Sequence, residues 1–105
     1  MSDESHVVVP PSFLALFVEP GRIKPNVPRE HILQRYEFCE DLAAMLTDHA
    51  KSKKWELGIM EADVLVRIHL GLLSAGAGVN AVEAGWVTIR LAELLEWECP
   101  RLSTD

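Results

Sequence analysis

The segment HLGLLSAGAGV at residues 69–79 contains the glycine spacing that comes closest to a phosphate-binding motif. A Walker A loop needs four residues between its glycines and then Gly-Lys-Ser/Thr, so that backbone amides and one lysine hold the phosphates. No lysine lies near Gly78, and a dinucleotide-binding motif would need a preceding strand and a third glycine. We therefore expect Gly76 to follow a helix as its C′ residue and Gly78 to turn the chain into the next helix.

Histidines are the next candidates for chemistry, as metal ligands. His31 and His49 lie on one expected helix, about 27 Å apart at 1.5 Å per residue, which is too far to share one ion. His69 has no histidine or carboxylate three or four residues away, so the spacing of a helical metal site is missing. We expect His69 to be a core or boundary histidine with satisfied hydrogen bonds, and we predict no metal and no cofactor.

The nucleophilic and acidic side chains do not form a catalytic pattern. The chain has no G-x-S-x-G motif, and Cys39 stands beside Glu40 and Asp41, whose charges disfavour a thiolate. One face of an expected helix carries a row of carboxylates, but a single helix face does not form a cleft for acid–base catalysis. These carboxylates are Glu37, Glu40, Asp41 and Asp48. We therefore predict that the protein is not an enzyme and has no ATPase activity.

The composition of the 105 residues is typical of one acidic globular domain. Ten Lys and Arg against sixteen Asp and Glu give a net charge of -6, which disfavours general binding to nucleic acid. Lys51, Lys53 and Lys54 form a basic cluster at an expected helix C-terminus, where cations interact favourably with the helix dipole. A local nucleic-acid site at this cluster is the weaker alternative.

The apolar stretch at residues 7–18 is interrupted by Pro10 and Pro11 and follows acidic residues. It fits neither a signal peptide nor a membrane span, so we predict a cytoplasmic protein that does not bind membranes. The presence of two cysteines fits a reducing compartment. Cys39 is expected to be buried and Cys99 exposed, while a disulfide between them stays an open alternative.

Hydrophobic periodicity and capping residues predict an all-α fold, a small single-domain helical bundle of three main helices plus a short N-terminal helix. The expected parts are a flexible N-terminal arm at 1–11, a helical domain at 12–98 and a flexible tail at 99–105. The helices are expected at about 12–19, 28–54, 61–74 and 80–96. Asn80 and Glu83 form a capping-box pattern at the start of the last helix.

Two further expectations concern the packing of these helices. The helix at 61–74 is apolar almost all round, so it should be the central and most buried one. Trp55 and Leu57 follow the longest helix and are expected to fold back onto the core.

Part of the chain is similar to a known family. The similarity covers about 25 residues and is carried by Gly71, Leu72, Leu73, Gly76, Gly78 and Val79. This segment resembles one in the N-terminal domains of Clp-type AAA+ unfoldases, and the whole chain resembles small proteobacterial proteins labelled chaperone-ATPase-like. His69 is shifted relative to the histidine of the unfoldase domains, and the sequence contains no AAA+ module. The resemblance implies a docking module and not an ATPase.

Some of the aromatic residues could form an interaction surface. This surface would combine Phe13, Leu16 and Phe17 of the short helix with Trp97, and packing of these residues on their own domain is the other interpretation. We expect a non-catalytic helical protein–protein interaction module that binds an unknown protein or forms a homodimer. The alternative is a small-ligand-binding protein or enzyme, with a pocket lined by Trp86, Tyr36 and His69 or His49.

Overall fold

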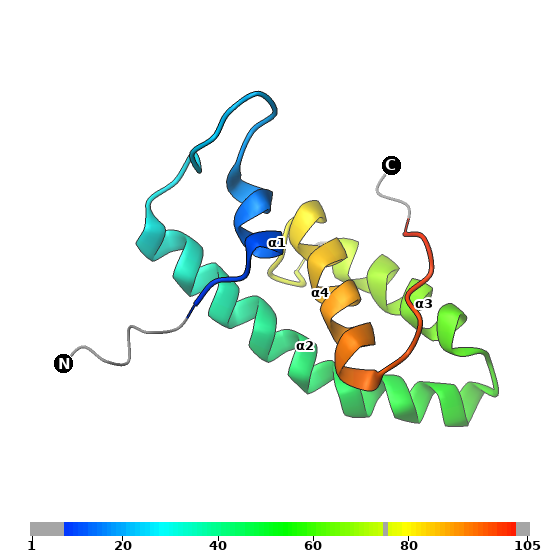
Figure 1. Cartoon of the computed structure of the whole chain (residues 1–105). Coiled ribbons are helices and arrows are strands. Elements are labelled where there is room, and N and C mark those ends of the chain that lie inside the picture. Colours follow the sequence, from blue (N-terminus) through cyan, green and yellow to red (C-terminus); the bar gives the residue numbers. More distant parts are fainter. Residues whose placement is uncertain (1–7, 75, 103–105) are drawn as a thin grey trace. The chain divides into compact units, whose positions relative to one another are not determined.

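The computed structural model describes residues 8–74 and 76–102, and within these ranges the chain forms helices and no strand (Figure 1). The elements are α1 (Pro11–Leu14), the 3-10 helix η2 (Ala15–Phe17), α2 (Arg29–Leu57), α3 (Glu61–Leu73) and α4 (Ala81–Leu95). The predicted all-α class, a small helical bundle of three main helices and a short N-terminal one, is confirmed. Residues 1–7 of the expected arm and 103–105 of the expected tail lie outside the described residues.

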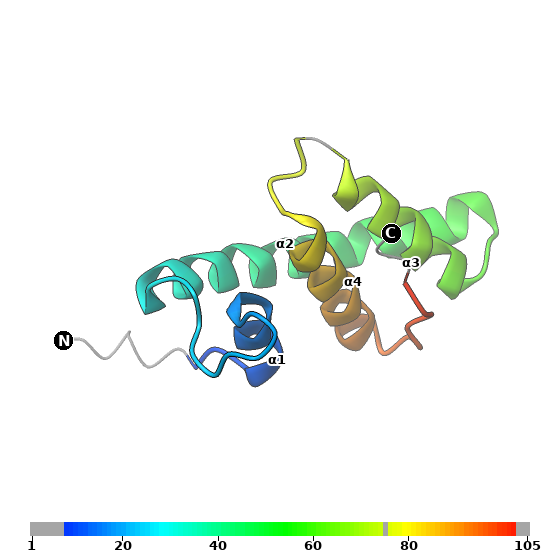
Figure 2. The ribbon, with the colours of Figure 1, turned by 90° about the horizontal axis from the view of Figure 1, so that it is seen from above.

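The chain divides into two compact units, one ending at Glu37 and one beginning at Phe38, and α2 contributes residues to both. The first unit contains α1, η2, the following loop and the first turns of α2, which lie alongside α1 (Figure 2). Pro11 opens α1, where its missing N–H leaves no hydrogen bond unmade. The short helix ends at Phe17 and not at residue 19, because Val18 is extended and the Phe17 carbonyl accepts a hydrogen bond from the Asn26 N–H at 2.8 Å.

The core of the second unit forms where α4 crosses α2 and packs along α3 (Figure 1). Cys39, Ala43 and Ala50 of α2 are fully buried, and side chains this small allow a neighbouring helix to approach closely. α3 and α4 bury larger side chains, among them Val64, Leu65, Ile68, Leu72, Trp86, Val87 and Leu91. Cys39 is buried, as predicted. Cys99 was expected to be exposed but is half-buried. Both residues are free thiols.

The expectation that α3 is the central and most buried helix is wrong, because α4 buries more of its residues. Val66, Leu70 and Leu73 of α3 are exposed, although Val64 and Leu65 of the same helix are fully buried. An outer helix of a bundle buries one face only, so the apolar residues on the opposite face of α3 stay in contact with solvent.

The last turn of α2 departs from the sequence prediction. The helix continues to Leu57 and is closed by Gly58, which has a φ of 64° and donates its N–H to the Lys54 carbonyl at 3.0 Å. Trp55 and Leu57 do not fold back onto the core, since 88% and 48% of their surfaces are exposed. They remain helical where a turn was expected, so the Trp55 side chain points into solvent and the Leu57 side chain is only partly covered.

The glycine-containing segment connects α3 to α4. α3 ends at Leu73 and is followed by its C-cap, Ser74, whose backbone is extended. The N–H and the hydroxyl of Ser74 both donate to the Gly71 carbonyl, at 3.2 and 2.6 Å. Gly76 and Gly78 have φ angles of 95° and 87°, so both use the conformational freedom of glycine. Gly76 lies two residues beyond the C-cap, however, and is not the C′ residue that we expected.

The start of α4 is the capping box predicted from the sequence. The N–H of Glu83 donates to Asn80 Oδ1 at 2.9 Å, and the N–H of Asn80 donates to Glu83 Oε1 at 3.0 Å. Two amides at the helix terminus that lack partners within the helix are thereby satisfied, and the boundary of α4 is fixed by residues three positions apart.

Candidate functional site

The four residues predicted as an interaction surface belong to different units. Phe13, Leu16 and Phe17 are in the first unit, and Trp97 is in the second. Phe13 is fully buried, and its ring centroid lies 5.5 Å from the centroids of Phe17 and of Tyr36. Leu16 and Phe17 are half-buried. Phe13 therefore anchors the short helix within its own unit, while its two neighbours remain partly accessible.

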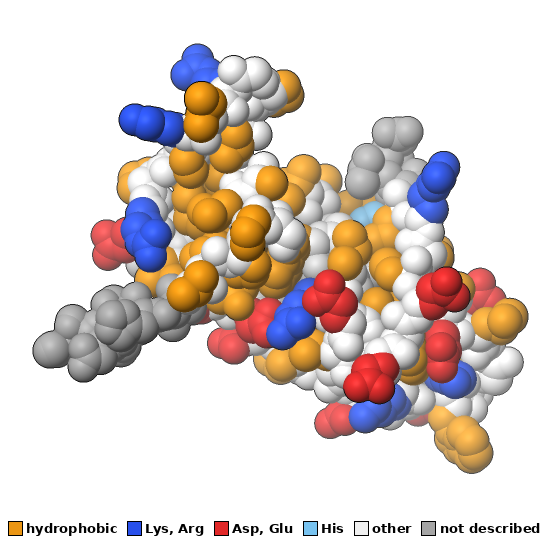
Figure 3. All heavy atoms as spheres, in the orientation of Figure 1, with side chains coloured by type: hydrophobic (Ala, Val, Ile, Leu, Met, Phe, Trp, Pro, Cys, Tyr) orange, Lys and Arg blue, Asp and Glu red, His pale blue; other side chains and the backbone are white. Residues whose placement is uncertain are grey.

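Trp97 follows α4 and is half-buried, with the ammonium of Lys54 5.6 Å from its ring centroid. Lys54 also forms an ion pair with Glu61 at 2.9 Å, and Lys53 forms one with Glu56 at 3.7 Å. Figure 3 shows acidic and basic side chains interspersed around this end of α2. Two of the three lysines in the basic cluster are thus engaged in local pairs.

The three histidines that the structure describes, His31, His49 and His69, lie in different environments. His31 lies edge-on to the ring of Phe17, with centroids 6.0 Å apart. His69 is buried on the apolar face of α3, but its Nε2 atom has no hydrogen-bond partner among the described residues. We expected the hydrogen bonds of His69 to be satisfied, and this expectation is wrong for Nε2. The reason is that apolar side chains surround the position of His69 on the helix. Within residues 8–74 and 76–102, no group of three or more His, Cys, Asp or Glu is placed to hold a metal ion.

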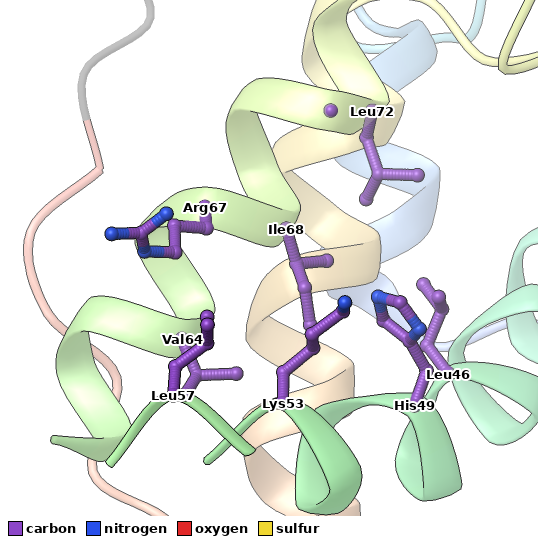
Figure 4. A pocket seen from close by; sticks show the side chains of 9 residues that line it. Leu46, His49, Lys53, Leu57, Val64, Arg67, Ile68 and Leu72 are labelled. Carbon is purple, nitrogen blue, oxygen red and sulfur yellow. The ribbon is translucent and has the colours of Figure 1, made fainter. Parts of the chain in front are cut away.

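A groove of about 490 Å³ lies between α2 and α3 in the second unit. Its apolar lining comes from Leu46 and Leu57 of α2 and from Val64, Ile68 and Leu72 of α3 (Figure 4). On α2 the lining residues recur at steps of three and four, and on α3 the apolar lining residues Val64, Ile68 and Leu72 recur at steps of four, so each helix presents a row of side chains to the groove.

The polar residues that line the groove are His49 and Lys53 on α2 and Arg67 on α3. Figure 4 shows the imidazole of His49 beside the ammonium of Lys53, and the guanidinium of Arg67 extended outward at the opposite edge. None of the described residues lining the groove is a carboxylate. Within the described ranges, His49 and Arg67 have no ion pair, while Lys53 has the exposed pair with Glu56.

The two helices that form the groove also carry exposed positions near it in the sequence. Gly71 lines the groove and is exposed, and a Cβ atom added there would meet no atom within 4 Å. Met45 lies one turn before His49 on α2 and is 72% exposed. An apolar floor with polar edges is the anatomy of a protein interface.

The groove is not the pocket expected from the sequence. Trp86, Tyr36 and His69 do not line it, and His49 does. In the sequence, Leu46 and Ile68 fit the apolar stripes of their helices, which does not distinguish a groove from a core. The signal that could have identified the groove is the spacing of His49 and Lys53 within the same row as Leu46, since polar residues in an apolar row indicate an edge.

No family model, curated protein or solved structure matches the chain. The resemblance to the N-terminal domains of Clp-type unfoldases stays a prediction. In the part of the chain that the structure describes, no helix combines the length and the apolar character needed to cross a membrane.

Proposed function

We propose that this protein is a non-catalytic interaction module that binds a helix of a partner protein in the groove between α2 and α3. The observation that supports this proposal is the groove itself, with an apolar floor, hydrogen-bond donors at both edges and a volume of about 490 Å³. In helix-in-groove recognition, an amphipathic helix inserts apolar side chains spaced at i, i+3 or i+4, and i+7 into such a surface.

The dimensions of the groove support a helical occupant. The row from Leu46 to Leu57 spans about 16 Å at 1.5 Å per residue, or about three helical turns. Three anchors of a partner helix, from i to i+7, need about 10 Å along its axis. Leu57, Arg67 and Gly71 are exposed, so the groove opens to solvent and leaves room for a helix longer than the groove.

Binding of a small amphiphilic ligand is the second candidate, because the volume lies within the range of about 300–1,000 Å³ for ligand pockets. Such pockets bury most of the surface of their ligand, however. The exposed lining residues favour a partner that supplies its own covering surface. A cytoplasmic site of action is part of the proposal, supported by the two free thiols.

The test is to fill the groove without removing a core side chain. A Gly71→Phe variant adds a ring inside the groove, at a helix position where an added Cβ atom meets nothing within 4 Å. Gly85→Phe is the matched control, since Gly85 lies on α4, has the same open space around its Cβ position and does not line the groove. Both variants should retain the helical signal and cooperative melting of the wild type.

The readout is co-purification from lysate of the source organism, analysed by mass spectrometry. A protein that is retained by the wild type and by Gly85→Phe, and lost with Gly71→Phe, is the expected result. Equal retention by all three proteins contradicts the proposal, because binding would then not use the groove.

A further inference from the structure

We propose that the groove selects an acidic amphipathic helix, with apolar side chains in the groove and Asp or Glu side chains facing Lys53, His49 and Arg67. This inference rests on the proposed function, because it specifies the chemistry of the partner that the groove receives. It is carried by the charge of the groove edges and by their positions on the two helices.

The charge at the groove edges is opposite to that of the whole chain. The protein has a net charge of -6, yet the polar residues lining the groove are two cations and one imidazole. Arg67 carries no ion pair within the described ranges, and a guanidinium stays charged at every physiological pH. These groups are therefore available to the carboxylates of a partner.

Among the described residues, Lys53 is paired with Glu56, at 3.7 Å and with both side chains well exposed. An exposed pair of this kind contributes little to stability, so Lys53 can exchange Glu56 for a partner carboxylate at small cost.

The two edges lie on different helices. His49 and Lys53 are one turn apart on α2, and Arg67 lies on α3 at the opposite edge (Figure 4). A helix in the groove would therefore meet donors on both sides of its apolar stripe. Carboxylates flanking that stripe on either side complement this arrangement, whereas lysines there would face like charges.

A second copy of this chain is a poorer occupant, because two molecules of charge -6 repel each other as they approach. Nucleic acid would satisfy the cations, but it offers no apolar side chains for Leu46, Val64 and Leu72. An acidic amphipathic helix satisfies both the floor and the edges.

The experiment uses a matched set of dye-labelled synthetic peptides of about 15 residues, long enough to form a helix. All have leucines at i, i+4 and i+7, and they differ only in the residues flanking the leucine stripe, which are Glu, Gln or Lys. Affinity for the full chain is measured by fluorescence anisotropy at low and at high salt.

The Glu peptide should bind best and the Lys peptide about tenfold more weakly at low salt, and this difference should shrink as salt screens the charges. Arg67→Glu should weaken binding of the Glu peptide about fivefold and improve binding of the Lys peptide. Glu56→Gln, which frees Lys53, should strengthen binding of the Glu peptide about twofold. Lys51→Glu is the matched control, because Lys51 lies on α2 but does not line the groove, and it should leave the preference unchanged.

The outcomes separate this inference from the proposed function. Equal affinity for all peptides, abolished by Gly71→Phe, would overturn the acidic partner while supporting a groove that binds helices. No binding of any peptide, together with binding of dodecanoate that Gly71→Phe blocks, would overturn both in favour of a small amphiphile. A homodimer that Gly71→Phe disrupts would replace the acidic partner with a second copy.

Discussion

Arg90 of α4 holds Glu40 of α2 in a two-pronged ion pair. Arg90 Nε lies 2.9 Å from Glu40 Oε1, and Arg90 Nη2 lies 2.9 Å from Glu40 Oε2. Glu93 contacts the same guanidinium through Nη1 at 3.1 Å. Hydrogen bonds with Glu40, and secondarily with Glu93, raise the pKa of Arg90 above its ordinary value, so the guanidinium stays charged. This geometry fixes where α4 crosses α2.

Removal of this ion pair should destabilise the second unit moderately. Because both side chains are about one third exposed, Glu40→Gln or Arg90→Met should lower the free energy of unfolding by about 1 kcal/mol. The melting temperature, measured by circular dichroism, should fall by about 5 °C at low salt. Glu93→Gln serves as the control, because its pair is more exposed and should be worth less than about 0.5 kcal/mol. If Glu93→Gln lowered the free energy of unfolding as much as Glu40→Gln, this result would contradict a dominant role of Glu40.

The second prediction concerns Gly78, whose positive φ and close neighbour both disfavour a side chain. A Cβ atom at Gly78 would lie 3.2 Å from Cζ of Phe38, whereas one at Gly76 would meet nothing within 4 Å. Both residues have a positive φ, so alanine should cost about 1 kcal/mol at Gly76 and more at Gly78. Urea denaturation of the two variants measures this difference.

A double-mutant cycle isolates the contribution of the contact. Phe38→Leu removes the ring atom that the new methyl group would meet, so Gly78→Ala should be less costly in that background than in the wild type. Equal costs in the two backgrounds would mean that the backbone angle alone accounts for the effect.

The local structure of the chain was predictable where neighbouring residues determine it. The side chains of Asn80 and Glu83 form the capping box that starts α4, so the sequence alone indicates where this helix begins. Gly78 was correctly interpreted as a turn residue, since it has a φ of 87° between α3 and α4. In each case the physical cause lies within a few residues of the effect.

The groove and the exposed surfaces were not predictable in the same way. Leu46 and Ile68 fit an apolar stripe whether or not another helix covers them, and coverage depends on how α2, α3 and α4 cross. Trp55 was assigned to the core because large aromatics are usually buried, but one additional helical turn leaves it 88% exposed. The Arg90–Glu40 pair joins residues fifty positions apart, a relation that periodicity cannot predict.

The third prediction concerns Cys99, the half-buried thiol near the C-terminus. Burial raises the pKa of the Cys99 thiol above its ordinary value, because it disfavours the thiolate. Alkylation requires the thiolate, so the pH of half-maximal rate with iodoacetamide should be higher in the native protein than in urea. Peptide mapping distinguishes Cys99 from the fully buried Cys39, which should react only after unfolding.

The same shift has a consequence for stability. The pKa of the Cys99 thiol is lower in the unfolded chain than in the folded protein. The protonated thiol therefore makes its full contribution to the free energy of unfolding at pH values below the pKa of the unfolded chain. This contribution is lost as the pH rises through the higher folded pKa. Stability should therefore decrease in this alkaline range, and Cys99→Ser should reduce the decrease. An alkylation profile that is identical in native and unfolded protein would contradict the burial of this thiol.

Photo-crosslinking from within the groove tests the central claim of helix binding most directly. A benzophenone side chain at residue 71 points into the groove, and the same group at residue 85 provides the matched control on α4. Irradiation of intact cells should give a cross-linked product with another protein from position 71 and none from position 85. The cross-linked peptide should be helical and rich in Asp or Glu. No product from position 71, or the same products from both positions, would contradict a partner helix in this groove.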